Sequence, residues 1–183
     1  YDGGKYKTRD SILNRVEKML EEGADIIDIG VMSTRHGAKE ISIEEEKDKV
    51  YEIVCLVRDN FNETIISVDT YRSEVARIAV NSGADIINDI SGGDFDEKMF
   101  DFIVETKVPY ILMHTQGKPE VMQNNPKYED VVKDIIKVMS QKVNRLESYG
   151  VKDIILDPGF GFGKTIDHNY ELLRNLKVFS FLY

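Results

Sequence analysis

The fold of this chain is constrained most by a repeated pairing of an amphipathic stretch with a short apolar run. Short, β-branched runs that lie between helical patterns are typical of a parallel sheet buried on both faces. The string Gly-Ala-Asp-Ile-Ile occurs at 23–27 and again at 83–87, and each copy indicates a glycine that ends a helix directly before a strand. The runs are Asp25–Gly30, Thr64–Asp69, Asp85–Ile90, Val108–His114 and Asp153–Asp157.

The segments between these runs have the spacing of amphipathic helices. Ser42 and Glu45 have the spacing of a capping box at the start of the second segment. Because no change in composition and no linker interrupts the alternation, residues 1–183 are predicted to form a single α/β domain. The expected helices are Thr8–Glu22, Ile43–Asn60, Tyr71–Ser82, Phe95–Thr106, Tyr128–Tyr149 and Asp167–Leu176.

Polar side chains lie at or near the end of every apolar run, and they are Asp28, Asp69, Asn88, His114 and Asp157. Parallel α/β chains form either an open doubly wound sheet or a closed (β/α)8 barrel. An open sheet gathers its ligand groups near one switch point, whereas a barrel draws them from the carboxyl ends of many strands. The even distribution along this chain favours the TIM-barrel fold.

The charge and cysteine content limit the partners and the compartment. A formal net charge of −9 argues against binding to nucleic acid or to an anionic membrane, although it leaves room for a local basic pocket. The single cysteine, Cys55, allows no internal disulfide, and no apolar run approaches the ~20 residues of a membrane span. The sequence therefore predicts a cytoplasmic protein.

The segment 154–164 is the most informative stretch for function. A short strand ends on Asp157, and the sequence Pro-Gly-Phe-Gly-Phe-Gly-Lys follows it. Such loops occur where a ligand needs close backbone approach, one fixed charge and a ring to pack against. A P-loop would need glycine where Pro158 stands, and a dinucleotide fingerprint would need glycine where Lys164 stands. Lys164 is therefore given a secondary role, beside the substrate or as a loop or surface charge.

Other loops carry weaker signals, and each has a structural alternative. Thr34 and Arg35 follow the first run and suit a phosphate or a carboxylate, although a solvated loop arginine is the commoner explanation. Asp69 is either a ligand group or a turn residue. Asn88 either meets the edge of a heterocycle or forms an Asx turn. The histidines lack metal-ligand spacing, so no metal site is predicted from the residues.

The remaining polar candidates are carboxylates and an amide without matching bases. Such groups suit a neutral, donor-rich ring such as an aminopyrimidine, because two parallel N–H groups can meet one dry carboxylate. The polar residues are Asp69, Asn88 and Asp157, and their apolar neighbours are Ile90, Met113 and Phe162.

Five ordered strings resemble the dihydropteroate synthase family, and they are IIDIG…STRHGA, ISVDTYRSEVA, GADIINDISGG, YILMHTQGKPEVMQ and IILDPGFGFGKTIDHNYELL. The resemblance runs from Tyr1–Gly4 to about Leu176. It implies a (β/α)8 barrel enzyme of folate biosynthesis and a sulfonamide target. The family joins p-aminobenzoate to 6-hydroxymethyl-7,8-dihydropterin pyrophosphate and releases 7,8-dihydropteroate and pyrophosphate.

The resemblance also implies roles for residues that match the family motifs. Asp157 would grip the aminopyrimidine edge of the pterin, and Asp69 and Asn88 would join it. Thr34 and Arg35 would touch the pyrophosphate and help to close the p-aminobenzoate site. Loss of pyrophosphate leaves positive charge on the pterin methylene, which makes the carboxylates of Asp69 and Asp157 the catalytic candidates.

Ile90, Met113 and Phe162 would form the apolar walls of the pterin site, and Phe162 would also border p-aminobenzoate. Lys164 is kept among the substrate-binding candidates. The family further implies a magnesium ion and a homodimer of the complete protein.

The chain also departs from the family pattern. The first strand with its Asn-Val-Thr-Pro loop, which helps to bind magnesium and pyrophosphate, is absent, and so are a later Ser-Arg-Lys-Ser lysine and an Arg-x-His. Val31, Met32 and His36 stand where bacterial members usually have Gly, Glu and Pro. We therefore expect an incomplete barrel of five of the ~8 units, prone to aggregation in isolation through unpaired strand edges.

Two other functions stay open at this point. One is a methyltetrahydrofolate-dependent methyltransferase domain with the same pterin pocket, against which the second loop and the string 161–164 argue. The other is a non-catalytic barrel subunit that binds a pterin or a partner. A purely structural explanation would need five polar strand ends to coincide in order, and we rank it last.

Overall fold

The computed structural model describes residues 5–6, 8–32, 41–117, 122 and 126–182. Five strands form one sheet in the order β1-β2-β3-β4-β5, and every neighbouring pair is parallel. The strands are β1 (Ile26–Gly30), β2 (Ile65–Asp69), β3 (Ile86–Asp89), β4 (Tyr110–Met113) and β5 (Ile154–Asp157).

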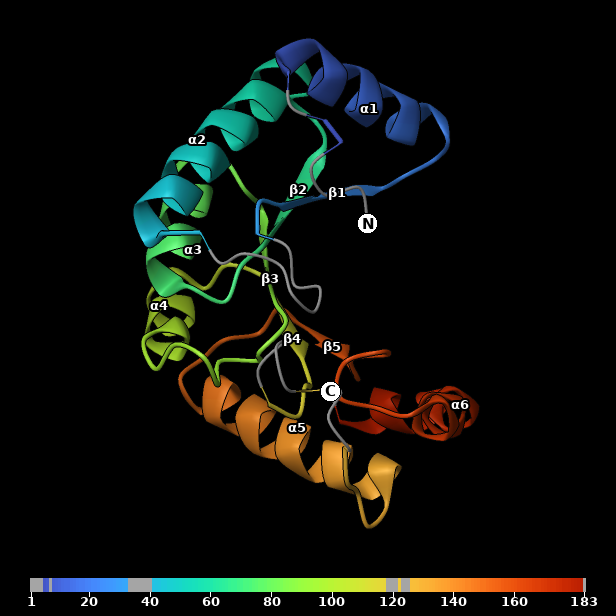
Figure 1. Ribbon diagram of the computed structural model, residues 1–183. Helices are drawn as coiled ribbons and strands as arrows, with labels where there is room; N and C mark the ends of the chain where they lie inside the picture. The colour runs from blue at the N-terminus through green and yellow to red at the C-terminus, as the bar shows by residue number, and fades with distance from the viewer. Residues whose placement is uncertain (1–4, 7, 33–40, 118–121, 123–125, 183) are drawn as a thin grey trace.

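Six α-helices and one 3-10 helix are found in the described residues. Figure 1 shows the sheet as a curved inner wall, with α2, α3, α4 and α5 along its outer side. The helices are α1 (Arg9–Glu21), α2 (Ile43–Asn60), α3 (Ser73–Asn81), α4 (Met99–Thr106), α5 (Val131–Ser148) and α6 (Ile166–Arg174), followed by η1 (Leu176–Phe181).

The strand order identifies the architecture. Each strand lies beside the strand that precedes it in sequence, so the order never reverses and the sheet has no switch point. A sequential parallel sheet with its helices on the convex side is the arrangement of a (β/α)8 barrel, here as an incomplete barrel of five strands. The predicted fold class is therefore confirmed.

The core lies between the sheet and the outer helices. Alternate residues of each strand point outward into this core, as the buried and exposed positions of β1 show most clearly. The fully or almost fully buried outward residues include Ile27, Ile66, Val68, Ile87, Tyr110 and Leu112, which pack with residues of α2 to α5.

The prediction that both faces of the sheet are buried is wrong for the concave face. Ile26, Ile65 and Ile155 are 41%, 42% and 46% exposed there. Five strands curve through only part of a barrel, so side chains that point inward have no facing strands to pack against in the described structure.

Some predicted helix starts also need correction. Ser42 caps α2 by accepting from the Glu45 amide at 3.1 Å, but the Glu45 carboxylate bonds Lys49, so only half of the capping box forms. The fourth helix begins at Met99 rather than Phe95. The carboxylate of Asp96 accepts from the amides of Ser73 and Lys98. These hydrogen bonds hold the residues just before α4 in a turn.

Candidate functional site

The polar strand ends converge on one edge of the sheet. Asp69 on β2 is in register with Gly30 on β1 and with Asn88 on β3. Farther along the sheet, Met113 on β4 is in register with Asp157 on β5. Because all five strands run the same way, these residues share the carboxyl edge where barrels place their ligands.

Asp69 has an unusual electrostatic environment. Burial raises the pKa of its carboxyl group from 3.8 to about 8, and the nearby charges of Asp28, Asp89 and Glu46 add to the effect. The side chain is partly exposed at the end of β2. A carboxyl group with this pKa exchanges its proton near neutral pH, which is a common property of functional sites.

Asp28 is a further member of this group, although the sequence marked it only as a strand end. It lies on β1 in register with Ser67, and its carboxylate accepts the Asn88 amide at 3.4 and 3.5 Å. The hydroxyl of Ser67 is buried and has no hydrogen-bond partner among the described residues. The sequence did contain a signal for Asp28: it lies two residues before Gly30, the end of β1, and residues two apart on a strand share a face.

Asp89 follows Asn88 directly but points to the opposite side of the sheet. It is fully buried and accepts from the Tyr110 hydroxyl at 2.7 Å and from the Ser91 hydroxyl at 2.7 Å. Its other partners are the amides of Ser91 and Gly93. Burial raises the pKa of Asp89, and these hydrogen bonds oppose that shift. Asp89 therefore holds the loop after β3 in place rather than facing a ligand.

The apolar candidates lie beside the polar edge. Ile90 follows β3 and Met113 ends β4, and both are buried. Phe162 is partly exposed in the loop after β5, where its amide donates to the Gly159 carbonyl at 3.1 Å. These residues lie at or after the ends of β3, β4 and β5, on the same edge of the sheet as the polar groups, which suits the apolar wall of a ligand site.

The loop after β5 packs directly against the loop after β4. The Asp157 carboxylate accepts the Gly159 amide through Oδ1 at 2.8 Å, and the Asp157 carbonyl accepts the His114 amide at 3.0 Å. A Cβ atom on Gly159 would lie 2.0 Å from the His114 carbonyl oxygen, and Gly159 also has a φ of +74°. Only glycine fits between the two loops at this point.

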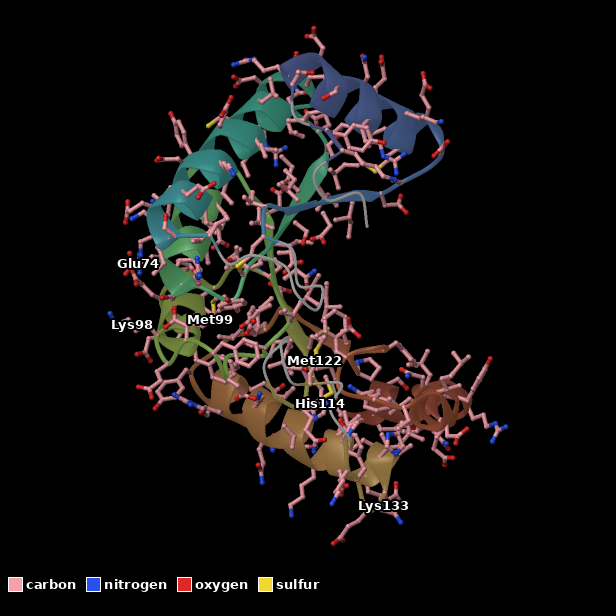
Figure 2. The ribbon with its side chains drawn as sticks, viewed as in Figure 1. Glu74, Lys98, Met99, His114, Met122 and Lys133 are labelled. Carbon is pink, nitrogen blue, oxygen red and sulfur yellow. The ribbon has the colours of Figure 1, made fainter. Side chains whose placement is uncertain are left out.

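Lys164 is buried, which corrects its interpretation as a surface charge. It is 4% exposed, and its ammonium group donates to the Phe162 carbonyl at 2.8 Å and to the His114 carbonyl at 3.1 Å. Figure 2 shows His114 near the inner side of α5, whereas Glu74 and Lys98 lie on the outer side of the arc. Sequence reasoning missed this burial because the contacts come from a loop 50 residues away.

Thr34 and Arg35 lie outside the described residues. Ile41, which follows this segment, is held by Arg72, which donates to the Ile41 carbonyl at 3.0 Å and to the Glu46 carboxylate at 2.8 Å. Glu46 is fully buried and also accepts from the Thr70 hydroxyl at 2.8 Å. The loop after β2 is thereby tied to α2, beside Asp69 at the strand end.

A cavity of about 440 Å³ is lined mostly by residues of α1, β1 and α2, and Asp28 and Asp69 are its only members from the polar group. It does not include Asn88, Met113, Asp157 or Phe162, so it is not the predicted ligand site. Within the described ranges, no three His, Cys, Asp or Glu side chains are grouped so that they could hold a metal ion. The same residues include no helix that is long and apolar enough to cross a membrane.

The fold and this edge define an incomplete α/β barrel with acidic and apolar side chains at the carboxyl ends of its strands. The family model described as "Pterin binding enzyme" matches residues 1–182. The chain belongs to this family.

Several proteins similar to this chain are dihydropteroate synthases. The dihydropteroate synthase of Haemophilus influenzae is 45% identical over 180 residues, which cover 97% of this chain and 65% of that protein. A Yersinia pestis dihydropteroate synthase structure with a sulfonamide drug complex has a TM-score of 0.93 and 38% identity, with 99% and 66% of the two chains covered. A Burkholderia cenocepacia dihydropteroate synthase structure with 7,8-dihydropteroate has a TM-score of 0.83 and 40% identity, with 93% and 61% covered. The chain thus spans slightly less than two thirds of each of these proteins.

Proposed function

We propose that this chain forms the pterin side of a dihydropteroate synthase. The enzyme would condense p-aminobenzoate with 6-hydroxymethyl-7,8-dihydropterin pyrophosphate to give 7,8-dihydropteroate and pyrophosphate. The observation that carries the proposal is the shared carboxyl edge of Asp69, Asn88 and Asp157, with Met113 in register beside Asp157. The complexes of similar enzymes with a sulfonamide drug and with 7,8-dihydropteroate support it.

Each polar residue has a role that follows from its chemistry. Asp157 offers a carboxylate to the two parallel N–H groups of the aminopyrimidine edge, and its Oδ1 is already oriented by the Gly159 amide. Asn88 can donate and accept along the same ring. Ile90, Met113 and Phe162 exclude water from the ring faces, which strengthens these hydrogen bonds.

The reaction needs little proton transfer from the protein. The arylamine nitrogen forms a bond to the pterin methylene carbon while the bond from that carbon to the pyrophosphate oxygen breaks. The surplus proton of the amine passes to solvent. Positive charge that develops on the methylene favours the ionised form of Asp69, which would lose its proton to solvent and then stabilise that charge.

Thr34 and Arg35 remain the proposed contacts for pyrophosphate and for closure of the p-aminobenzoate site. Magnesium remains an expectation from the family resemblance. The described residues do not group as its ligands, so we assign it no ligand among them.

A cytoplasmic location and a homodimer of the full-length protein belong to the same proposal. The single cysteine supports a reducing compartment. Ile166, Tyr170 and Leu173 form an exposed apolar face on α6, a surface suited to contact with another polypeptide surface. Cell fractionation and analytical ultracentrifugation measure the two properties.

The test is product formation by the full-length protein with both substrates, measured by mass spectrometry of the pterin product and by pyrophosphate release. We expect 7,8-dihydropteroate only when p-aminobenzoate is present, and we expect a sulfonamide to inhibit it. Asp157→Asn should abolish most of the product, whereas Asp153→Asn, at the exposed opposite end of β5, should not. Methyl transfer from methyltetrahydrofolate to a corrinoid, or pterin binding without any product, would refute the proposal.

A further inference from the structure

The buried ammonium group of Lys164 is fully occupied by protein acceptors. Its Nζ atom lies 2.8 Å from the Phe162 carbonyl oxygen, 3.1 Å from the His114 carbonyl oxygen and 3.3 Å from His114 Nδ1. A lysine ammonium group has three hydrogens to donate, and three acceptors surround this one. Lys164 is thus oriented into the protein between two loops and not toward a ligand.

These contacts connect neighbouring strand ends. His114 follows β4, whereas Phe162 and Lys164 belong to the loop after β5. The Tyr128 hydroxyl adds a third connection from the segment before α5, because it donates to the Gly163 carbonyl at 2.9 Å. The Phe162 amide donates to the Gly159 carbonyl, and the Phe162 carbonyl accepts from Lys164. The backbone of Phe162 is therefore held on both sides.

The charge states of Lys164 and His114 favour the contact between Lys164 Nζ and His114 Nδ1 at neutral pH. Lys164 only donates, so His114 Nδ1 must accept, which places the imidazole proton on Nε2. Burial, Lys164 and Lys142 lower the pKa of His114 to about 3. Burial lowers the pKa of Lys164 to about 8, and the nearby charge of Asp157 opposes this shift. A charged lysine therefore faces a neutral histidine.

We propose that Lys164 is a positioning residue that connects the loops after β4 and β5 and thereby fixes Phe162 beside the p-aminobenzoate site. The proposal rests on the proposed function and on the role that the family resemblance implies for Phe162, which is to border p-aminobenzoate as well as the pterin. Without Lys164, the stretch 160–163 would retain two glycines at φ of +81° and +59° but lose the bond that holds its centre. The affinity for p-aminobenzoate should then fall more than the affinity for the pterin, because the polar groups of the pterin site lie on the strands.

The test compares Lys164→Met, Lys164→Arg and the control Lys152→Met, an exposed lysine just before β5, in the full-length protein. For Lys164→Met we expect the KM for p-aminobenzoate to rise about tenfold and the pterin Kd to change less than about threefold. Lys164→Arg should recover part of the loss, because a guanidinium group can still donate to both carbonyls. Should Lys164→Met fail to fold, Lys164→Arg should still raise the KM for p-aminobenzoate more than the pterin Kd, by a smaller factor.

Three results would overturn the proposal. A fall in kcat with both substrate constants unchanged would indicate a merely structural lysine, and a loss confined to pterin affinity would indicate direct ligand contact. Amide hydrogen exchange of the ligand-free protein separates this inference from the proposed function. Exchange at Phe162 should rise about tenfold in Lys164→Met and stay unchanged in Lys152→Met, whether or not the protein makes dihydropteroate. Unchanged exchange at Phe162 would refute the positioning role.

Discussion

The side-chain amide of Asn88 on β3 donates to the carboxylate of Asp28 on β1, with Nδ2 3.4 Å from Oδ2 and 3.5 Å from Oδ1. The contact passes across β2, whose residue Asp69 is in register with Asn88. Asp28 therefore orients the Asn88 amide that would hydrogen-bond to the ligand. Its charge also raises the pKa of Asp69, as the second cause after burial. One carboxylate affects both neighbours.

Replacing Asp28 with asparagine should lower the pH at which Asp69 titrates. The substitution keeps the shape of the side chain but removes the negative charge that opposes ionisation of Asp69. We expect the midpoint of the pH dependence of pterin binding to fall by about one pH unit. Fluorescence titration of a dihydropterin between pH 5 and 9 measures it. Asp25→Asn, exposed at the other end of the same run, is the control, and equal midpoints in the two variants would contradict the prediction.

The stability of the folded protein should fall as pH rises from 6.5 to 8. The folded-state pKa of Asp69 is about 8 and its ordinary value is 3.8, so the folded state binds more protons than the unfolded state in this window. His114 acts in the opposite sense mainly below 6.5, because its folded-state pKa is about 3, and Lys164, whose pKa is lowered to about 8, opposes the trend only near the top of this window.

Urea unfolding at pH 6.5 and at pH 8 tests this sign. We expect a loss of about 1 kcal/mol in the free energy of unfolding, after allowance for solvent screening of the partly exposed carboxyl group. Asp69→Asn should remove most of the difference, while Asp59→Asn, an exposed residue of α2, should leave it intact. A stability that rises over this interval in the wild-type protein would show that Asp69 is ionised throughout.

Gly159 and Gly161 form a matched pair for the packing of the loop after β5. Both have positive φ, +74° and +81°, so alanine at either position costs about 1–2 kcal/mol of backbone strain. Alanine at 159 would also place Cβ 2.0 Å from the His114 carbonyl oxygen, whereas at 161 it would meet nothing within 4 Å.

We therefore expect Gly159→Ala to lower the free energy of unfolding by about 3 kcal/mol or more and Gly161→Ala by about 1 kcal/mol. Because this clash would move the backbone amide at 159 away from Asp157 Oδ1, pterin affinity should fall about tenfold or more in Gly159→Ala only. Chemical unfolding and pterin titration of both variants measure these effects. Similar losses in the two variants would mean that the loops are not in close contact.

The fold was largely readable from periodicity. The five apolar runs predicted five strands, and the polar residues that end them predicted the shared edge, because parallel strands carry their carboxyl ends to one side. The predicted single domain covering residues 1–183 agrees with one continuous sheet in the described residues, but domain extent itself stays a prediction.

Residues whose roles depend on distant neighbours could not be predicted in the same way. Asn88 and Asp89 are adjacent and chemically similar, and only strand parity and the Tyr110 hydroxyl decide which of them faces the site. Lys164 ends a glycine-rich loop that resembles an exposed phosphate grip, yet its acceptors include His114 on another loop. The roles of Thr34 and Arg35 stay predictions, because they lie outside the described residues.

The central claim is that Asp157 anchors a pterin at the carboxyl edge of the sheet. Equilibrium binding of a dihydropterin to the full-length wild-type protein, Asp157→Asn and Asp153→Asn tests it most directly. We predict that Asp157→Asn raises the Kd about thirtyfold or more, since hydrogen bonds to a charged group contribute about 1.5–3 kcal/mol each, while Asp153→Asn stays within about twofold. The same Kd for both variants would contradict the claim and assign the pterin to another part of the protein.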